Sequence, residues 1–175
     1  MKRRNTLISI GIVFFYVMGF VLAFFFEFAI EDFLLKKNPN PLIEFLSLNK
    51  EQLFFKIFMN NLYVVIINVI GFISFGVLTL LNTFYNGFVL GFVIKTVVKV
   101  SSLSFILKHL LPHSFEIIGI LISSFIGVYL GIKLFSFCFI ENKEPIKIKT
   151  ISNLLFLSIL IIFISAFLET YVSIE

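Results

Sequence analysis

Five long apolar segments, separated by short polar ones, occupy most of this 175-residue chain. We expect the segments at residues 7–26, 53–81, 88–107, 113–139 and 151–170. Each is at least as long as the roughly 20 residues that a helix needs to cross the hydrocarbon core of a bilayer. Because lipid cannot satisfy backbone polar groups, a crossing segment of this kind must be a helix. The sequence therefore predicts an all-α polytopic transmembrane helical bundle, forming a single integral membrane domain over residues 1–175.

The composition agrees with a membrane protein and excludes a water-soluble domain. Hydrophobic residues make up 59% of the chain and charged residues 14%, whereas soluble domains average about 45–50% and about 25%. The basic residues are spread along the chain instead of clustering, so no nucleic-acid partner is expected. The partner that the composition does predict is the lipid bilayer. The single cysteine, Cys138, is interpreted as a small buried hydrophobe.

Two polar segments stand out near the N terminus. Lys2, Arg3 and Arg4 precede the first apolar run, which lasts about 20 residues and ends in phenylalanines, so we interpret it as an uncleaved signal anchor. The segment 27–52 mixes charged and apolar residues around an Asn-Pro-Asn-Pro break. This mixture predicts short amphipathic helices at the membrane surface.

The distribution of loop cations predicts the orientation in the cell membrane. Lysine and arginine translocate poorly, so loops that carry them tend to stay in the cytoplasm. A cytoplasmic N terminus places six loop cations inside: Lys2, Arg3, Arg4, Lys143, Lys147 and Lys149. Five spans then put the C terminus outside, together with the polar segment 27–52.

Several residues are expected to shape turns and helix packing. Asn86-Gly87 predicts a turn between the second and third spans, because both residues tolerate positive φ. Pro112 predicts a break before the fourth helix. The third span could run on through Ser101 or split there into a shorter span and an interfacial helix. Small residues that would permit close helix approach are Gly91, Gly127 and Gly131.

Polar side chains at membrane depth are candidates for function, because they normally face a bundle interior or a water-filled cavity. They form an expected cluster toward the outer ends of the spans: Asn60, Asn61, His113, Glu116 and Glu169. The preferred interpretation is structural hydrogen bonding within the bundle. The alternative is proton or cation coupling, in which Glu116 and Glu169 lie close enough to perturb each other. A metal site would need His113, Glu116 and Glu169 together, and we expect no metal and no cofactor.

The remaining charged candidates are Lys95 and Lys99, which are one helical turn apart. They could bind an anionic lipid, an acidic group of a partner or a substrate, or Lys95 could simply extend toward the interface. Sequence motifs of hydrolases and phosphate-binding enzymes are absent, including HExxH and Gly-x-Ser-x-Gly. We therefore expect a protein that is not an enzyme.

The order and spacing of these residues resemble the stage II sporulation protein M family. The resemblance rests on Asn60-Asn61, Asn86-Gly87 with Gly91, Pro112-His113 with Glu116, the Gly127 and Gly131 pair, and Ala166 to Glu169, and it covers most of the chain. One departure is Ser114, which stands where the family usually has glycine after Pro-His.

This resemblance implies a non-enzymatic membrane scaffold that acts through homo- or hetero-oligomerisation with other membrane proteins. The namesake resembles a scaffold that brings a peptidoglycan-degrading complex to the sporulation septum. Other relatives accompany circular bacteriocin genes, which implies an alternative role. In that role the chain would be a transport or immunity subunit for peptide export or self-protection, working with a separate ATPase.

Overall fold

The structure is a computed structural model that describes residues 2–26, 48–100, 103–140 and 145–172. Side chains are described in these ranges except at residues 2, 97, 99–100 and 103–113. The helices are α1 (Lys2–Ala23), α4 (Lys50–Ile70), the short 3-10 helix η1 (Gly71–Ser74), α5 (Val77–Val100), α6 (Leu103–Phe139) and α7 (Ile148–Tyr171). All regular structure in the described part of the chain is helical, which confirms the predicted all-α class.

Five helical segments are long and apolar enough to cross a membrane, as predicted. They are Arg3–Ala23, Lys50–Ser74, Val77–Thr96, Ser114–Phe139 and Ile148–Tyr171. Large apolar side chains cover their outer surfaces, and exposed examples are Phe14, Tyr63, Phe156 and Phe163. The protein is therefore a multi-pass membrane protein.

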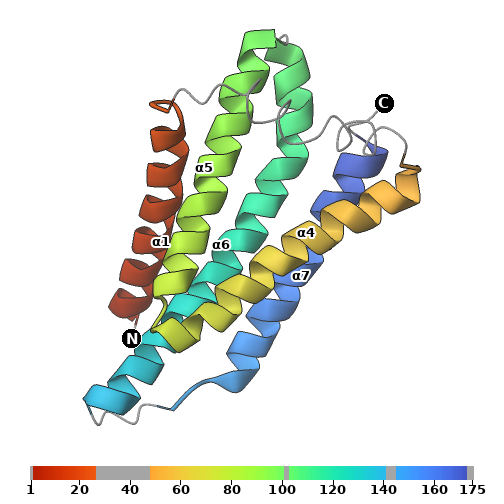
Figure 1. The fold of residues 1–175 in the computed structure, drawn as a ribbon. Helices are drawn as coiled ribbons and strands as arrows, with labels where there is room; N and C mark the ends of the chain where they lie inside the picture. The colour runs from red at the N-terminus through yellow and green to blue at the C-terminus, as the bar shows by residue number, and fades with distance from the viewer. Residues whose placement is uncertain (1, 27–47, 101–102, 141–144, 173–175) are drawn as a thin grey trace.

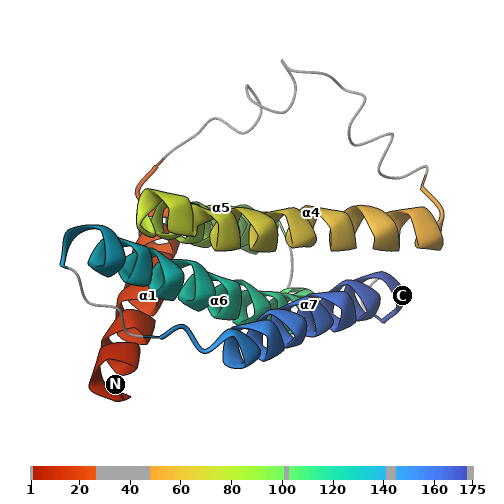
Figure 2. The ribbon, with the colours of Figure 1, turned by 90° about the horizontal axis from the view of Figure 1, so that it is seen from below.

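Successive spans run in opposite directions, so the two chain ends lie at opposite ends of the bundle (Figure 1). Helix α1 packs along α5, and α6 packs along α7, while α4 contacts α5, α6 and α7. Seen from below, α4 and α5 form one layer over α6 and α7, with α1 crossing beside them (Figure 2). Ile8, Ile12 and Val128 form a buried cluster where α1 meets α6.

The reversal between the second and third spans lies at residues 71–76, so the predicted turn at Asn86-Gly87 is wrong. Both of those residues lie inside α5. The chain reverses through η1, followed by Phe75 with φ 57° and Gly76 with φ 90°. The Ser74 hydroxyl donates to the Gly71 carbonyl and accepts from the Leu78 amide, each at 2.8 Å. Positive φ strongly favours glycine at position 76.

Consequently the predicted spans 53–81 and 88–107 have different limits in the structure. The second helix ends at Ile70 and the third begins at Val77. The six residues between them carry no charge, so hydropathy could not separate the two helices. Asn49 and Gln52 form a capping box that starts α4, with the Gln52 amide donating to the Asn49 Oδ1 at 2.8 Å.

The predicted break at Pro112 is also wrong, because α6 is continuous from Leu103 to Phe139. Proline is tolerated inside membrane helices where neighbouring groups satisfy the freed backbone carbonyl. Helix α5 is described as far as Val100, and Ser101, where the third span was expected to continue or split, lies outside the described residues. Surface helices were expected within residues 27–52. Residues 27–47 of that segment lie outside the described residues. Cys138, interpreted as buried, is exposed near the end of α6.

Candidate functional site

Two adjacent groups of polar side chains lie inside the bundle. The first, which we term the polar network, comprises Asn68, Thr79, Asn82, Thr83, Ser123 and Ser124. Five of its six members have no exposed surface, Asn82 being partly buried. Such groups must find protein partners, because the surrounding lipid offers none.

Asn68 on α4 is the centre of the polar network. Its Nδ2 donates to the Ser123 hydroxyl of α6 at 2.9 Å, and its Oδ1 accepts from the Asn82 Nδ2 of α5 at 2.8 Å. The Thr79 hydroxyl donates to the Asn68 backbone carbonyl at 2.7 Å. One asparagine therefore joins three helices through its side chain and its main chain.

Further hydrogen bonds extend this connection to α7. The hydroxyl oxygens of Thr83 on α5 and Ser124 on α6 lie 2.7 Å apart. The Ser158 hydroxyl on α7 donates to the Gly119 carbonyl on α6 at 2.7 Å. Helices α4, α5, α6 and α7 are thus connected by hydrogen bonds within the bundle.

The second group lines a cavity of about 140 Å³ that we term the Glu116 cavity. Four helices each contribute one polar side chain to its wall: Tyr16 from α1, Asn60 from α4, Asn86 from α5 and Glu116 from α6. Apolar residues complete the wall: Val89, Leu90, Val93, Ile117 and Ile120. A carboxyl group, two amides and a phenol can together bind water, a cation or a polar group of a partner.

The two groups adjoin each other along α5 and α6. The Asn86 Nδ2 donates to the Asn82 carbonyl at 2.7 Å, so Asn86 connects the Glu116 cavity to the polar network. On α6, Glu116 precedes Ser123 by two helical turns, which places the network on the side of the cavity that faces the start of α1. The buried network therefore lies directly beneath the cavity.

The structure brings together only part of the predicted polar cluster. Asn60 and Glu116 share the cavity, and Asn86, which was expected in a turn, joins them. Asn61 is buried on α4, where its Oδ1 lies 3.4 Å from the Asn60 Nδ2. Glu169 lies in the last turn of α7 and is not among the residues that line the cavity. The side chain of His113 lies outside the described ones.

Metal ligation was considered through His113, Glu116 and Glu169. Among the side chains that the structure describes, no group of three or more His, Cys, Asp or Glu lies close enough to hold an ion. Because the His113 side chain is not among them, the structure does not test a metal site formed by His113, Glu116 and Glu169.

Lys95 binds the end of α1. Its Nζ donates to the carbonyls of Phe24 and Phe26 at 2.9 and 3.0 Å. A cation at the C-terminal end of a helix is favoured by the helix dipole, so this lysine fastens α1 to α5. Lys99, its predicted companion, has a side chain outside the described ones.

The glycines of the predicted set lie at close helix contacts. A Cβ at Gly87 would overlap the Tyr16 carbonyl, and one at Gly91 would overlap the Phe20 carbonyl, both across the α1–α5 contact. On α6, a Cβ at Gly127 would overlap the Asn68 carbonyl, and one at Gly131 would overlap the backbone of Phe75 and Gly76. Backbones approach so closely at these positions that no side chain fits.

Sequence reasoning missed most of the polar network. A signal was present on α5, where Thr79, Thr83 and Asn86 recur at spacings of four and three residues and so share a face. On α4, Asn61 and Asn68 are seven residues apart and lie on one face in the same way. Polar residues at helical spacing within an apolar span predict a contact with another helix.

Comparisons with known proteins identify the family. The family model of Stage II sporulation protein M matches residues 7–174. An uncharacterized protein of Methanocaldococcus jannaschii is 32% identical over 162 residues, which cover 90% of each chain. No solved structure matches the chain.

Proposed function

We propose that this chain, which belongs to the stage II sporulation protein M family, is a non-enzymatic membrane scaffold that assembles other membrane proteins or further copies of itself. The observation that carries the proposal is the polar network, whose hydrogen bonds join α4, α5 and α6 inside the bundle. Asn68, Thr79, Thr83, Ser123 and Ser124 have no exposed surface, so a packed and hydrogen-bonded layer lies beneath the Glu116 cavity. A rigid frame of this kind suits a protein that holds partners in fixed positions.

The Glu116 cavity is the place where we expect a partner to be recognised. Asn60 is exposed at its wall, whereas Tyr16 is buried and Asn86 and Glu116 are partly buried. A polar side chain on a neighbouring transmembrane helix could hydrogen-bond there, and such bonds contribute about 0.6 kcal/mol each on average in membranes. In this role Asn60 and Glu116 bind the partner, and the polar network holds α4, α5 and α6 in fixed positions relative to one another.

Photo-crosslinking in native membranes tests this role. A photo-reactive residue in place of Asn60 should give a discrete adduct with a second membrane protein or a second copy of the chain. The same residue in place of Ile66, which is exposed elsewhere on α4, is the matched control. Adding Glu116→Gln should weaken the Asn60 adduct. Recovery of monomer alone, with the crosslinker active, would overturn the proposal.

A second candidate function is a transport or immunity subunit for peptide export or self-protection, working with a separate ATPase. It is favoured by one observation, the placement of a carboxyl group in a cavity shared by four helices. Glu116 would then act in coupling, with Lys95, Lys99 and Glu169 along the pathway. Glu116→Gln should abolish export or resistance at unchanged membrane abundance, while Glu51→Gln at the exposed start of α4 should not. An unchanged phenotype in Glu116→Gln would remove this candidate.

We also propose a cytoplasmic N terminus. The starts of α1 and α7 lie at the same end of the bundle (Figure 1), and that end carries Arg3, Arg4, Lys147 and Lys149. In a Cys138→Ser background, Lys149→Cys should react with an impermeant maleimide only after cells are permeabilised. Lys50→Cys, at the opposite end, should react in intact cells. The reverse pattern would contradict this orientation.

A further inference from the structure

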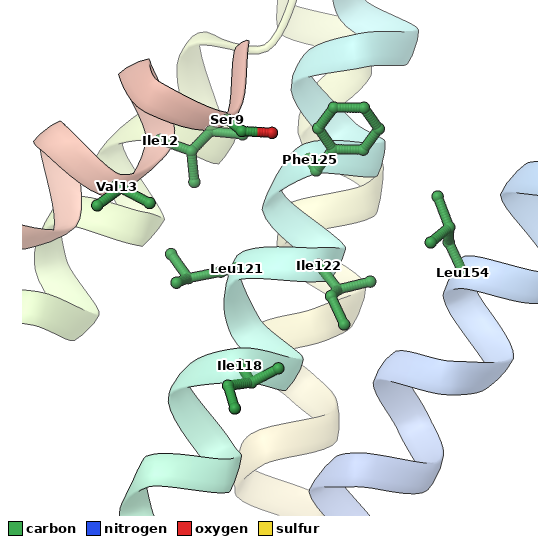
Figure 3. A pocket seen from close by; sticks show the side chains of 8 residues that line it. All are labelled: Ser9, Ile12, Val13, Ile118, Leu121, Ile122, Phe125 and Leu154. Carbon is green, nitrogen blue, oxygen red and sulfur yellow. The ribbon is translucent and has the colours of Figure 1, made fainter. Parts of the chain in front are cut away.

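An apolar groove lies between α1 and α7, with α6 as its floor (Figure 3). Its cavity measures about 330 Å³, and its walls are Ser9, Ile12 and Val13 of α1, Leu154 of α7, and Ile118, Leu121, Ile122 and Phe125 of α6. The groove is open to the membrane, because Val13 and Ile118 are 46% and 48% exposed. Its volume is within the range of about 300–1,000 Å³ that is typical of ligand sites.

The groove continues into a polar end. A second cavity of about 160 Å³ shares Phe125 and Leu154 with the first, and Asn5, Lys147 and Thr150 also line it. The Asn5 Oδ1 is buried and has no hydrogen-bond partner among the described residues. The Asn5 oxygen can accept from a donor such as a headgroup hydroxyl, whereas Lys147 and Thr150 in the same wall can donate to a phosphate.

The length of this groove matches one leaflet of a bilayer. Ile118 and Tyr129, at its two ends on α6, are eleven residues apart (129 − 118), which corresponds to about 17 Å of helix. The hydrocarbon core is about 30 Å thick, so the groove spans roughly half of it. Asn5 and Lys147 lie at the starts of α1 and α7, so the polar end of the groove lies toward an interface and the apolar end extends from it into the bundle.

Charge complementarity identifies the occupant. Lys147 is exposed immediately before α7, whose N-terminal dipole attracts phosphate. Basic groups between membrane helices, at the end of an apolar slot, are typical of sites for anionic lipid headgroups. We propose that an anionic phospholipid occupies the groove, with one apolar chain along Ile118 to Phe125 and its phosphate at Lys147. This proposal is independent of the scaffold role.

Native mass spectrometry of the purified full chain tests the site. The protein would be equilibrated in mixed micelles with equal amounts of phosphatidylglycerol and phosphatidylcholine, and retained lipid would be counted. The wild type should retain phosphatidylglycerol preferentially. Lys147→Gln should lower that retention about fivefold, the effect expected for one basic residue near a headgroup. Lys149→Gln, which removes the same charge outside the groove, should retain as much as the wild type.

A second pair of variants tests the apolar part of the groove. Leu154→Phe should displace the chain and reduce retention, whereas Leu157→Phe, on the exposed surface of α7, should not. Equal retention of both lipids, or equal losses in Lys147→Gln and Lys149→Gln, would overturn the proposal. So would a photo-reactive residue at Ile122 that traps a second copy of the chain instead of lipid.

Discussion

Helix α5 makes two contacts of opposite character. Toward α1 it presents Gly87 and Gly91, where a Cβ would overlap the Tyr16 and Phe20 carbonyls. Toward α4 and α6 it presents Thr79, Asn82 and Thr83, whose side chains make hydrogen bonds. The first contact depends on the absence of side chains, and the second depends on their chemistry.

The difference between these contacts shows two ways of holding membrane helices together. Lipid is as apolar as the helices, so burial of apolar surface does not drive their association. The α1–α5 contact relies on close backbone packing, which a single added side chain would disrupt. The α4–α5–α6 contact combines close packing at Gly127 with several hydrogen bonds, and the loss of one bond should leave the others in place.

The largest effect is expected from Gly87→Leu. The added side chain has no space against the α1 backbone, so the two helices must separate. Overpacking typically costs about 1–3 kcal/mol, and overlap with a backbone carbonyl should exceed that range. Gly11→Leu is the matched control, because nothing lies within 4 Å of a Cβ there. Unfolding in mixed micelles measures the difference, and equal stability of the two variants would contradict the role of this contact.

A smaller effect is expected from Asn68→Leu. It removes the side-chain bonds to Ser123 and Asn82, and the free energy of unfolding should fall by about 1–3 kcal/mol. Asn153→Leu makes the same exchange at an exposed position of α7. The same unfolding assay compares the two. A loss in Asn68→Leu no larger than in Asn153→Leu would show that the network is not stabilising.

The smallest effect is expected from Lys95→Gln. This change weakens the bonds to the Phe24 and Phe26 carbonyls at the end of α1. A cation at a helix C terminus is typically worth about 0.3–1 kcal/mol, so stability should fall within that range. Proteolysis near residue 26 would detect local loosening of α1. An increase in stability would contradict the assigned contact.

The sequence predicts the fold class and the five spans because membrane helices have a strong hydropathy signal. It misplaces the turn between the second and third spans, because Asn-Gly is a common turn pair in proteins generally. In this bundle Gly87 lies inside α5, where the absence of a side chain lets α1 pack closely. Asn86 lies beside it and donates a hydrogen bond to the Asn82 carbonyl. The true turn at 71–76 carries no charge, so only Ser74 and its two terminal glycines distinguish it.

Part of the candidate site was predictable from the sequence. Asn60 and Glu116 are conspicuous because polar residues are rare in apolar spans, and both line the cavity. Tyr16 lines the same cavity as Glu116, although the two are 100 residues apart in sequence. Its place there depends on how α1 packs against the rest of the bundle. Serine and threonine are common in membrane helices, so Ser123, Ser124 and Thr83 become conspicuous only when the helices are packed.

The central claim is that the polar network closes the bundle beneath the Glu116 cavity, and thiol accessibility tests it most directly. In a Cys138→Ser background, Asn60→Cys and Ser124→Cys would be treated with a small water-soluble maleimide in permeabilised membranes. Asn60 lines the Glu116 cavity, which we propose admits water, and Ser124 has no exposed surface, so we predict rapid labelling of Asn60→Cys and none of Ser124→Cys. Labelling of both at similar rates would mean that water crosses the network, and would contradict the account.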